Sequence, residues 1–296
     1  MTSETTAALP IRIIELAGLP GTGKSTIARH LETTLGAAGV PIIARAVALA
    51  DQRRFLHRQR RRLQLILRHA VGCGELYRRS FQLVAGSGQR SIWDFAIVTT
   101  NFWSIVALMA DRRAAGERVM IADQGLLQAL WSVQLSSHRA LSLDAWAPVL
   151  RAAGIAETLL VHVESDASVS RRRVSARARN WSRLKSGSPD EQSYEWQVAA
   201  KNMSSLVEWA RGNLPPDQYG ARVLSVKNHE GAPEAAADEI ASAYFKRSAS
   251  KARPSGIQQP QERAHEDRLF DHADGQHRRG ASPRAGSFAV AEAKRT

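Results

Sequence analysis

The chain has 296 residues, of which 44% are hydrophobic, and it contains one cysteine, Cys73. A single cysteine excludes a disulfide framework within the chain, and the polar residues 1–10 do not resemble a secretory signal, so we expect a cytoplasmic protein. The formal net charge of +13 favours anionic partners such as phosphorylated molecules or nucleic acid.

Short apolar runs alternate with longer amphipathic segments as far as residue 247. The pattern predicts strands at 11–17, 41–49, 118–123, 157–163 and 221–226, and helices at 26–35, 52–69, 75–84, 91–116, 126–135, 143–153, 167–178, 194–209 and 233–245. Gly72 and Gly74 are expected to end the helix at 52–69 and separate it from the next one. Residues 179–192 are expected to form a polar stretch. The most apolar segment, 95–110, is shorter than the roughly 20 residues of a membrane span, so it predicts a buried helix.

Residues 18–25 read Gly-Leu-Pro-Gly-Thr-Gly-Lys-Ser, the pattern of a P-loop, with a predicted strand before them and a helix after them. In such a loop, inward-pointing backbone N–H groups and the start of the helix form a cradle for phosphates. Lys24 is expected to reach the β- and γ-phosphates, and the Ser25 hydroxyl to join the Mg²⁺ shell. A chance match is the alternative. We predict Mg-ATP binding, with contacts from Gly18, Leu19, Pro20, Gly21, Thr22, Gly23, Lys24, Ser25 and Thr26.

The motif and the alternating elements together predict an α/β fold, the three-layer sandwich of P-loop NTPases, with a mainly parallel five-stranded sheet and helices on both faces. Residues 11–247 are expected to form this domain, with a helical acceptor-side insert at 50–117 and a basic lid at 166–192. Residues 1–10 are expected to form an N-terminal tail. Residues 248–296, rich in Gln, Arg, Ser, Gly and Pro, predict a disordered basic tail.

A carboxylate follows the predicted strand Val119-Met-Ile-Ala-Asp123. Because the carboxyl ends of parallel strands gather at the ligand crevice, Asp123 is expected beside the phosphates. There it would hold Mg²⁺, directly or through water, or accept a proton from an attacking hydroxyl. The alternative is that Asp123 caps the helix that starts after Gly125.

Six arginines lie in residues 166–183, after a predicted buried strand. Phosphoryl transfer needs cations that arrive as the site closes, which a mobile basic lid would supply. A solvated basic helix explains the same charges. Of these arginines we expect Arg173, Arg177 and Arg179 to enter the site and act in catalysis with Lys24 and Asp123.

With these features the chain resembles the P-loop kinases of the nucleoside and nucleoside-monophosphate kinase group, with thymidylate kinase nearest in layout. The resemblance covers residues 10–247 and includes Val226-Lys-Asn-His-Glu230 after the last predicted strand. It implies that Lys227 and Asn228 contact adenine, although an ordinary strand-to-helix turn explains the same pair.

One position departs from this family. Thymidylate kinases carry Asp-Arg, and deoxynucleoside kinases Glu-Arg-Ser, where this chain has Asp123-Gln124-Gly125. Gln124 lacks the charge with which that arginine positions the phosphates or the acceptor, which puts a nucleotide acceptor in doubt.

The predicted insert carries an arginine cluster at 53–68, followed by Trp93, Asp94 and Trp103. The arginines would grip an acceptor phosphate or a nucleic-acid backbone, or form a solvated face. Because they fall on nearly all sides of the helix, we favour a polyanion or surface role for part of them. The tryptophans are expected in the core rather than stacked on a base or sugar, and Asp94 would bind an acceptor hydroxyl.

The favoured function is therefore a kinase that transfers the γ-phosphate of Mg-ATP to a small-molecule acceptor such as a nucleoside, a nucleotide or a sugar-like molecule. A nucleic-acid-associated ATPase or polynucleotide kinase remains open because of the basic insert. A nucleotide-gated regulatory protein also remains open. No membrane partner is expected.

Overall fold

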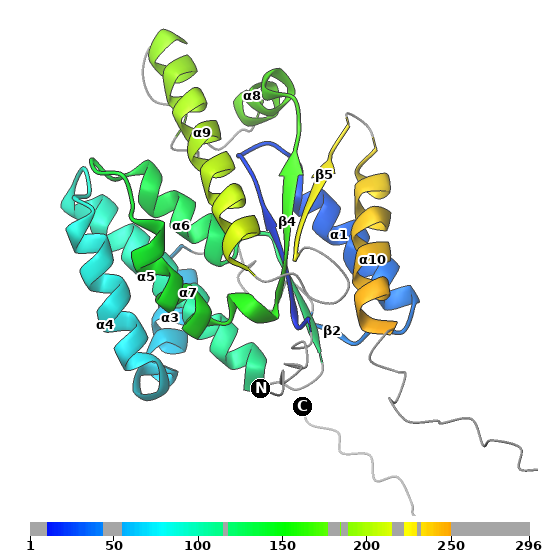
Figure 1. The fold of residues 1–296 in the computed structure, drawn as a ribbon, viewed down its shortest axis with the longest axis horizontal. Helices are drawn as coiled ribbons and strands as arrows, with labels where there is room; N and C mark the ends of the chain where they lie inside the picture. Colours follow the sequence, from blue (N-terminus) through cyan, green and yellow to red (C-terminus); the bar gives the residue numbers. More distant parts are fainter. Residues whose placement is uncertain are drawn as a thin grey trace, which may run out of the picture. The chain divides into compact units, whose positions relative to one another are not determined.

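Five parallel strands form the centre of the structure, a computed structural model that describes residues 11–43, 55–114, 118–176, 184, 189–214, 222–229 and 232–249 (Figure 1). The strands are β1 (Ile13–Ala17), β2 (Ile42–Ile43), β3 (Val119–Ala122), β4 (Thr158–Glu164) and β5 (Val223–Lys227). Their order is β2-β3-β1-β4-β5, so the strand before the P-loop lies in the middle. The described residues all belong to the compact unit Met1–Arg253.

Helices cover both faces of this sheet, so the predicted α/β fold is confirmed (Figure 1). On one face lie α1 (Lys24–Ala37) and α10 (Pro233–Ala249), which pack on each other. The other face carries α5 (Ile92–Ala114), α6 (Leu126–Leu135), α7 (Leu143–Ala153) and α9 (Pro189–Asn213). The remaining described helices are α3 (Phe55–Arg68) and α4 (Ala70–Gly86), which pack on α5, together with η1 (Ile155–Glu157) and α8 (Ala167–Ser175).

The strands are mostly apolar because both faces of the sheet are covered. All five residues of β1 are buried. Ile13 and Ala17 face the core cluster formed with α5, α6 and α9, whereas Ile14 and Leu16 face the cluster formed with α1 and α10. This burial fixes the register of β1 and hence the point at which the P-loop leaves the sheet.

Two predicted boundaries are wrong. Gly72 and Gly74 do not end a helix. Both lie inside α4, and the preceding helix, α3, already ends at Arg68. An interior glycine costs about 1 kcal/mol, and burial of Tyr77 and Val84 on α4 outweighs that cost. Helix α9 begins at Pro189, within the predicted polar stretch 179–192. Proline favours the first position of a helix, a signal that the apolar pattern alone does not contain.

Helix α5 is long and apolar enough to cross a membrane by length and composition, but half of its most apolar window is buried inside the protein. Phe102 and Met109 are fully buried in the core, as expected of a core helix in an α/β unit. Trp103 is partly buried, as predicted, and donates its indole N–H to Ser80 Oγ at 3.0 Å. Trp93 is the exception to the prediction, since it is 75% exposed.

Several predictions fall outside the described residues. These are the N-terminal tail 1–10, the end of the second strand and the start of the insert at 44–54, most of the second half of the lid at 177–183 and 185–188, and the tail from residue 250 onward. Ser248 and Ala249, assigned to the tail by sequence, instead end α10.

Candidate active site

The P-loop turns sharply between β1 and α1 (Figure 1). Gly21 and Gly23 adopt φ values of +87° and +91°, a region that side chains with a Cβ rarely adopt. Both glycines are also closely approached: a Cβ would lie 2.3 Å from Ser170 O at Gly21, and 2.2 Å from Asn228 Nδ2 at Gly23. The loop is therefore held between α8 on one side and the turn after β5 on the other.

Lys24 bends back over the loop. Its Nζ donates to Gly18 O at 2.7 Å and to Leu19 O at 2.8 Å. The ammonium group is therefore held by carbonyl oxygens of the loop, which it can exchange for phosphate oxygens.

Ser25 and Asp123 meet beside the loop, although they are 98 residues apart in the sequence. Ser25 Oγ donates to Asp123 Oδ2 at 2.8 Å. Asp123 does not cap α6, since Gly125 is the N-cap residue and no side-chain cap bond is made there. The pairing of β1 with β3 brings the two oxygens together.

Both oxygens suit Mg²⁺, a hard cation that prefers oxygen ligands and is usually held by one or two protein groups together with substrate phosphates and water. The described contacts therefore fit the predicted metal-binding pair, Ser25 and Asp123. Gln124, next in the sequence, is exposed.

The residues expected to contact adenine differ in their surroundings. Lys227 is exposed, whereas Asn228 is 5% exposed and donates from Nδ2 to Thr22 O in the P-loop at 2.6 Å. The Asn228 backbone N–H also donates to Glu164 O at 2.8 Å. Asn228 thus ties the turn after β5 to the P-loop. Contact of either residue with adenine stays a prediction.

Helix α8, which forms the first part of the predicted lid, lies against the P-loop. Asp166 caps it by accepting from the Ser168 N–H at 2.7 Å. Arg173, near its other end, donates from Nη1 to Gly21 O at 3.4 Å. One predicted lid arginine therefore reaches the loop, and the other two, Arg177 and Arg179, lie outside the described residues.

Sequence reasoning missed a buried carboxylate beside the loop. Glu15 on β1 is completely buried, and its Oε1 accepts the Gln128 N–H at 3.0 Å at the start of α6. Burial raises the pKa of Glu15 from 4.5 to about 7, against the lowering effect of backbone hydrogen bonds from Gln128, Leu127 and Leu126. The available signal was a carboxylate in an otherwise apolar strand.

Gln128 extends this contact to the P-loop itself, since its Oε1 accepts the Gly18 N–H at 3.2 Å. Gly125 makes room for Glu15, because a Cβ at this position would lie 2.3 Å from Glu15 Cδ. The glycine of Asp123-Gln124-Gly125 therefore has a packing role in this chain.

His162 on β4 forms a further polar contact near the loop. Its Nδ1 lies 3.2 Å from Glu164 Oε1. Burial lowers the pKa of His162, the Glu164 charge raises it, and the charges of Arg211 and Lys24 lower it further. We therefore treat this imidazole as neutral at pH 7.

The solved structures to which the chain is similar include two kinases. A deoxyadenosine kinase from M. mycoides with bound dCTP is 11% identical, with 78% of this chain and 99% of that chain covered and a TM-score of 0.44. A shikimate kinase from Acinetobacter baumannii in complex with shikimate is 13% identical, with 83% and 96% covered and a TM-score of 0.40. No curated protein gave a significant sequence match.

Residues 13–197, which include the P-loop, Asp123 and α8, match the family model described as an AAA domain. The chain belongs to this AAA domain family.

Proposed function

We propose that the chain is a kinase that transfers the γ-phosphate of Mg-ATP to the hydroxyl group of a small-molecule acceptor. The observation that carries this proposal is the 2.8 Å hydrogen bond between Ser25 Oγ and Asp123 Oδ2 beside the P-loop. This hydrogen bond brings together two oxygen atoms that can act as metal ligands. A phosphoryl-transfer site needs such groups to position a metal ion and a nucleophile.

Ser25 and Asp123 would hold Mg²⁺, which when bound neutralises charge on the β- and γ-phosphates. Lys24 is released from Gly18 O and Leu19 O to bind phosphate oxygens, and Arg173 adds positive charge from α8. Asp123 orients the attacking hydroxyl and accepts its proton. The acceptor oxygen bonds to the γ-phosphorus as the bond from that phosphorus to the bridging oxygen breaks, so ADP leaves.

The acceptor enters from the side of the sheet that carries the insert helices. There α5, α6 and α9 cover one face of the sheet, whereas α1 and α10 cover the other (Figure 1), and Gln128 of α6 contacts Gly18 of the P-loop. The absence of an arginine at Gln124 favours an acceptor that does not depend on this position for binding a phosphate.

The test is transfer of labelled phosphate from γ-labelled ATP in the presence of Mg²⁺ to pooled nucleosides, nucleoside monophosphates, sugars and amino sugars. We expect one pool to become labelled, and Lys24→Ala and Asp123→Asn to lower the rate at least 100-fold, as loss of a transition-state contact does. Tight ATP binding without labelling of any pool would contradict the proposal and favour a nucleotide-gated regulatory protein.

A further inference from the structure

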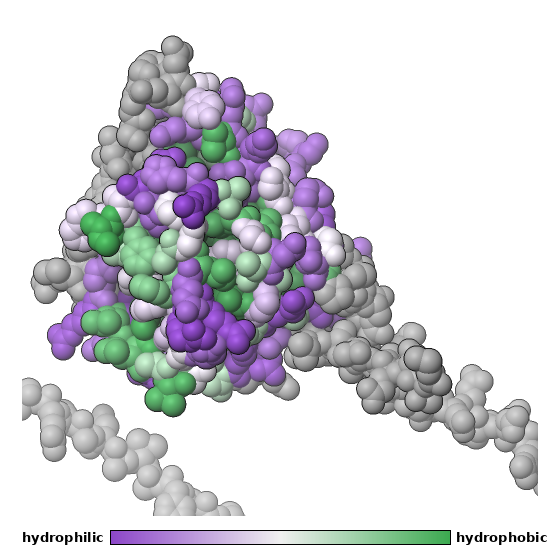
Figure 2. All heavy atoms as spheres, turned by 60° about the vertical axis from the view of Figure 1, so that its left-hand side comes forward, coloured by the Kyte–Doolittle hydropathy of each residue, from purple (hydrophilic) through white to green (hydrophobic). Residues whose placement is uncertain are grey.

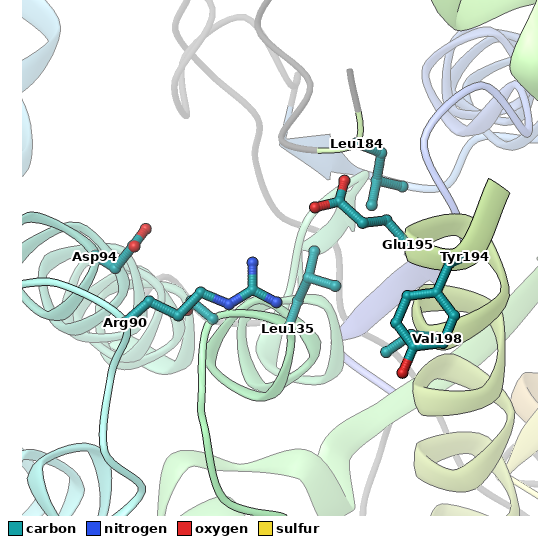
Figure 3. Close-up of a pocket in the computed structure, with 8 residues that line it drawn as sticks. Arg90, Asp94, Leu135, Leu184, Tyr194, Glu195 and Val198 are labelled. Carbon is teal, nitrogen blue, oxygen red and sulfur yellow. The ribbon is translucent and has the colours of Figure 1, made fainter. Parts of the chain in front are cut away.

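A cavity of about 270 Å³ lies between the start of α5, the end of α6 and the start of α9 (Figure 3), and none of its lining residues belongs to the P-loop. Three charged side chains, Arg90, Asp94 and Glu195, line it together with Leu135, Leu184 and Val198. The Arg90 guanidinium and the Glu195 carboxylate extend into the space from opposite sides (Figure 3). Pockets for drug-sized ligands start at about 300 Å³, so this volume suits a single ring.

The walls of the cavity are fixed by hydrogen bonds. The Arg90 N–H donates to Ser136 O at 2.9 Å, and Ser136 Oγ donates to Gln89 Oε1 at 2.7 Å. Asp94 is held by Ser91, whose Oγ donates to Asp94 Oδ2 and accepts the Asp94 N–H, both at 3.0 Å. Such a site is formed before its ligand arrives, which lowers the entropy cost of binding.

The charged groups do not neutralise one another. Among the residues that the structure describes, no ion pair joins Arg90 to Asp94 or Glu195, and Glu195 Oε2 is buried without a hydrogen-bond partner. A buried carboxylate oxygen without a donor is costly. One positive and two negative side chains give the lining a formal charge of −1, which disfavours an anion, and Glu195 Oε2 can still accept a hydrogen bond from a ligand.

One helix connects this cavity with the phosphate site. At the start of α6, Gln128 Oε1 accepts the Gly18 N–H, and at its end Leu135 lines the cavity. Seven residues of helix separate them, about 10 Å along the axis. The cavity and the phosphate site therefore border the same helix.

We propose that the cavity binds the non-reacting end of the acceptor, an uncharged or cationic ring that bears an amino group next to a hydrogen-bond acceptor. The amino group donates to Glu195, the acceptor atom takes a hydrogen bond from Arg90, and the apolar side chains contact the faces of the ring. Amino sugars and aminated nucleobases share this chemistry. This proposal rests on the proposed kinase function in one respect, namely that the molecule carrying the ring is the phosphate acceptor. Binding of the ring in the cavity does not depend on it.

The test measures binding of four probes to the full chain by calorimetry, with the P-loop saturated by Mg²⁺ and a non-hydrolysable ATP analogue. The probes are glucosamine, adenosine and their phosphomonoesters, glucosamine 6-phosphate and AMP. We expect glucosamine or adenosine to bind more tightly than its phosphomonoester. Glu195→Gln and Arg90→Leu should each weaken that binding at least tenfold, whereas Glu239→Gln on α10 should not change it.

Binding of none of the probes, preference for the phosphomonoesters, or affinities that Glu195→Gln and Arg90→Leu leave unchanged would overturn the proposal. Thermal unfolding of each variant shows that the fold is kept. The phosphate-transfer assay separates the two proposals. Transfer with an unchanged acceptor KM in both variants would reject the cavity and leave the kinase. Probe binding that the variants abolish, without transfer to any acceptor, would reject the kinase and leave the cavity.

Discussion

Gly125 accounts for part of the departure from the kinase motif at Asp123-Gln124-Gly125. The buried carboxyl group of Glu15 occupies the space that a side chain at this position would need. In return, Glu15 accepts hydrogen bonds from the first turn of α6. The motif position therefore serves to fasten α6 to β1, next to the P-loop.

Gly125→Ala is expected to destabilise the fold by about 1–3 kcal/mol, because the added methyl group overlaps Glu15 Cδ in a packed core. Urea unfolding monitored by circular dichroism measures this loss. Gly72→Ala is the matched control: nothing lies within 4 Å of its Cβ inside α4, so it should stabilise by roughly 0.5–1 kcal/mol. Equal effects of the two substitutions would reject the overlap.

Glu15 should make stability depend on pH in a defined window. Its pKa is raised by burial from 4.5 to about 7, so the folded chain holds the proton more tightly than the unfolded chain. The resulting stabilisation is complete below pH 4.5 and is lost as the pH rises to about 7. Glu15→Gln should remove this loss, on the order of 3 kcal/mol. Parallel pH profiles of the two proteins in urea unfolding would contradict the assignment.

Residue types and spacing were enough to predict the P-loop and its pairing with Asp123, since the motif and the strand-end carboxylate are local signals. They were not enough for Gln128 or Asn228. Both contact the P-loop from elements far away in the sequence, at separations of 110 and 206 residues. Those contacts depend on strand order and helix rotation, which no short pattern contains.

At the scale of elements, helix α8 packs against the P-loop through Ser170 O and Arg173, both of which lie close to Gly21. Asp166→Ala removes its N-cap, at a cost of about 1 kcal/mol to that helix. We expect faster hydrogen exchange in residues 167–175 and ATP binding weakened up to about fivefold. Asp144→Ala, in the first turn of α7, should change neither. An unchanged exchange rate in α8 would show that packing, rather than the cap, holds it.

Most elements were predictable because a buried strand or an amphipathic helix shows its period in the sequence. The ends were harder, as α4 and α9 demonstrate. Gly72 and Gly74 weaken the helical pattern locally, yet Tyr77 and Val84 anchor α4 in the core. The error at Gly72 and Gly74 therefore arose where tertiary packing overrides local propensity.

At the scale of the whole molecule, basic side chains outnumber acidic ones, which gives the formal net charge of +13. Figure 2 shows the side of the molecule that carries the insert helices, where strongly hydrophilic side chains lie beside hydrophobic ones. On α3, Arg60, Arg61 and Arg68 are exposed, whereas Arg62 donates to Asn101 Oδ1 at 2.8 Å. Part of the arginine cluster therefore belongs to the surface, as the sequence indicated, and part supports α5.

If the exposed arginines bind polyanions, the triple variant Arg60→Gln/Arg61→Gln/Arg68→Gln should reduce binding of a single-stranded RNA probe and flatten its salt dependence by about three charges. The KM for ATP should stay the same, because α3 lies in the insert rather than at the P-loop. Fluorescence anisotropy at several salt concentrations measures both the affinity for the RNA probe and its salt dependence. Absence of RNA binding by the unaltered chain at low salt would remove the nucleic-acid alternative.

Helix α6 touches the P-loop through Gln128 and borders the cavity through Leu135. If a ligand at one end displaces this helix, the other end is displaced as well, because rigid secondary elements can carry coupling between sites. Binding at the two ends is then a linked equilibrium, and the factor by which the nucleotide changes the affinity for the ring equals the factor by which the ring changes the affinity for the nucleotide. The order in which the two ligands arrive would alter the route to the ternary complex and leave its free energy the same.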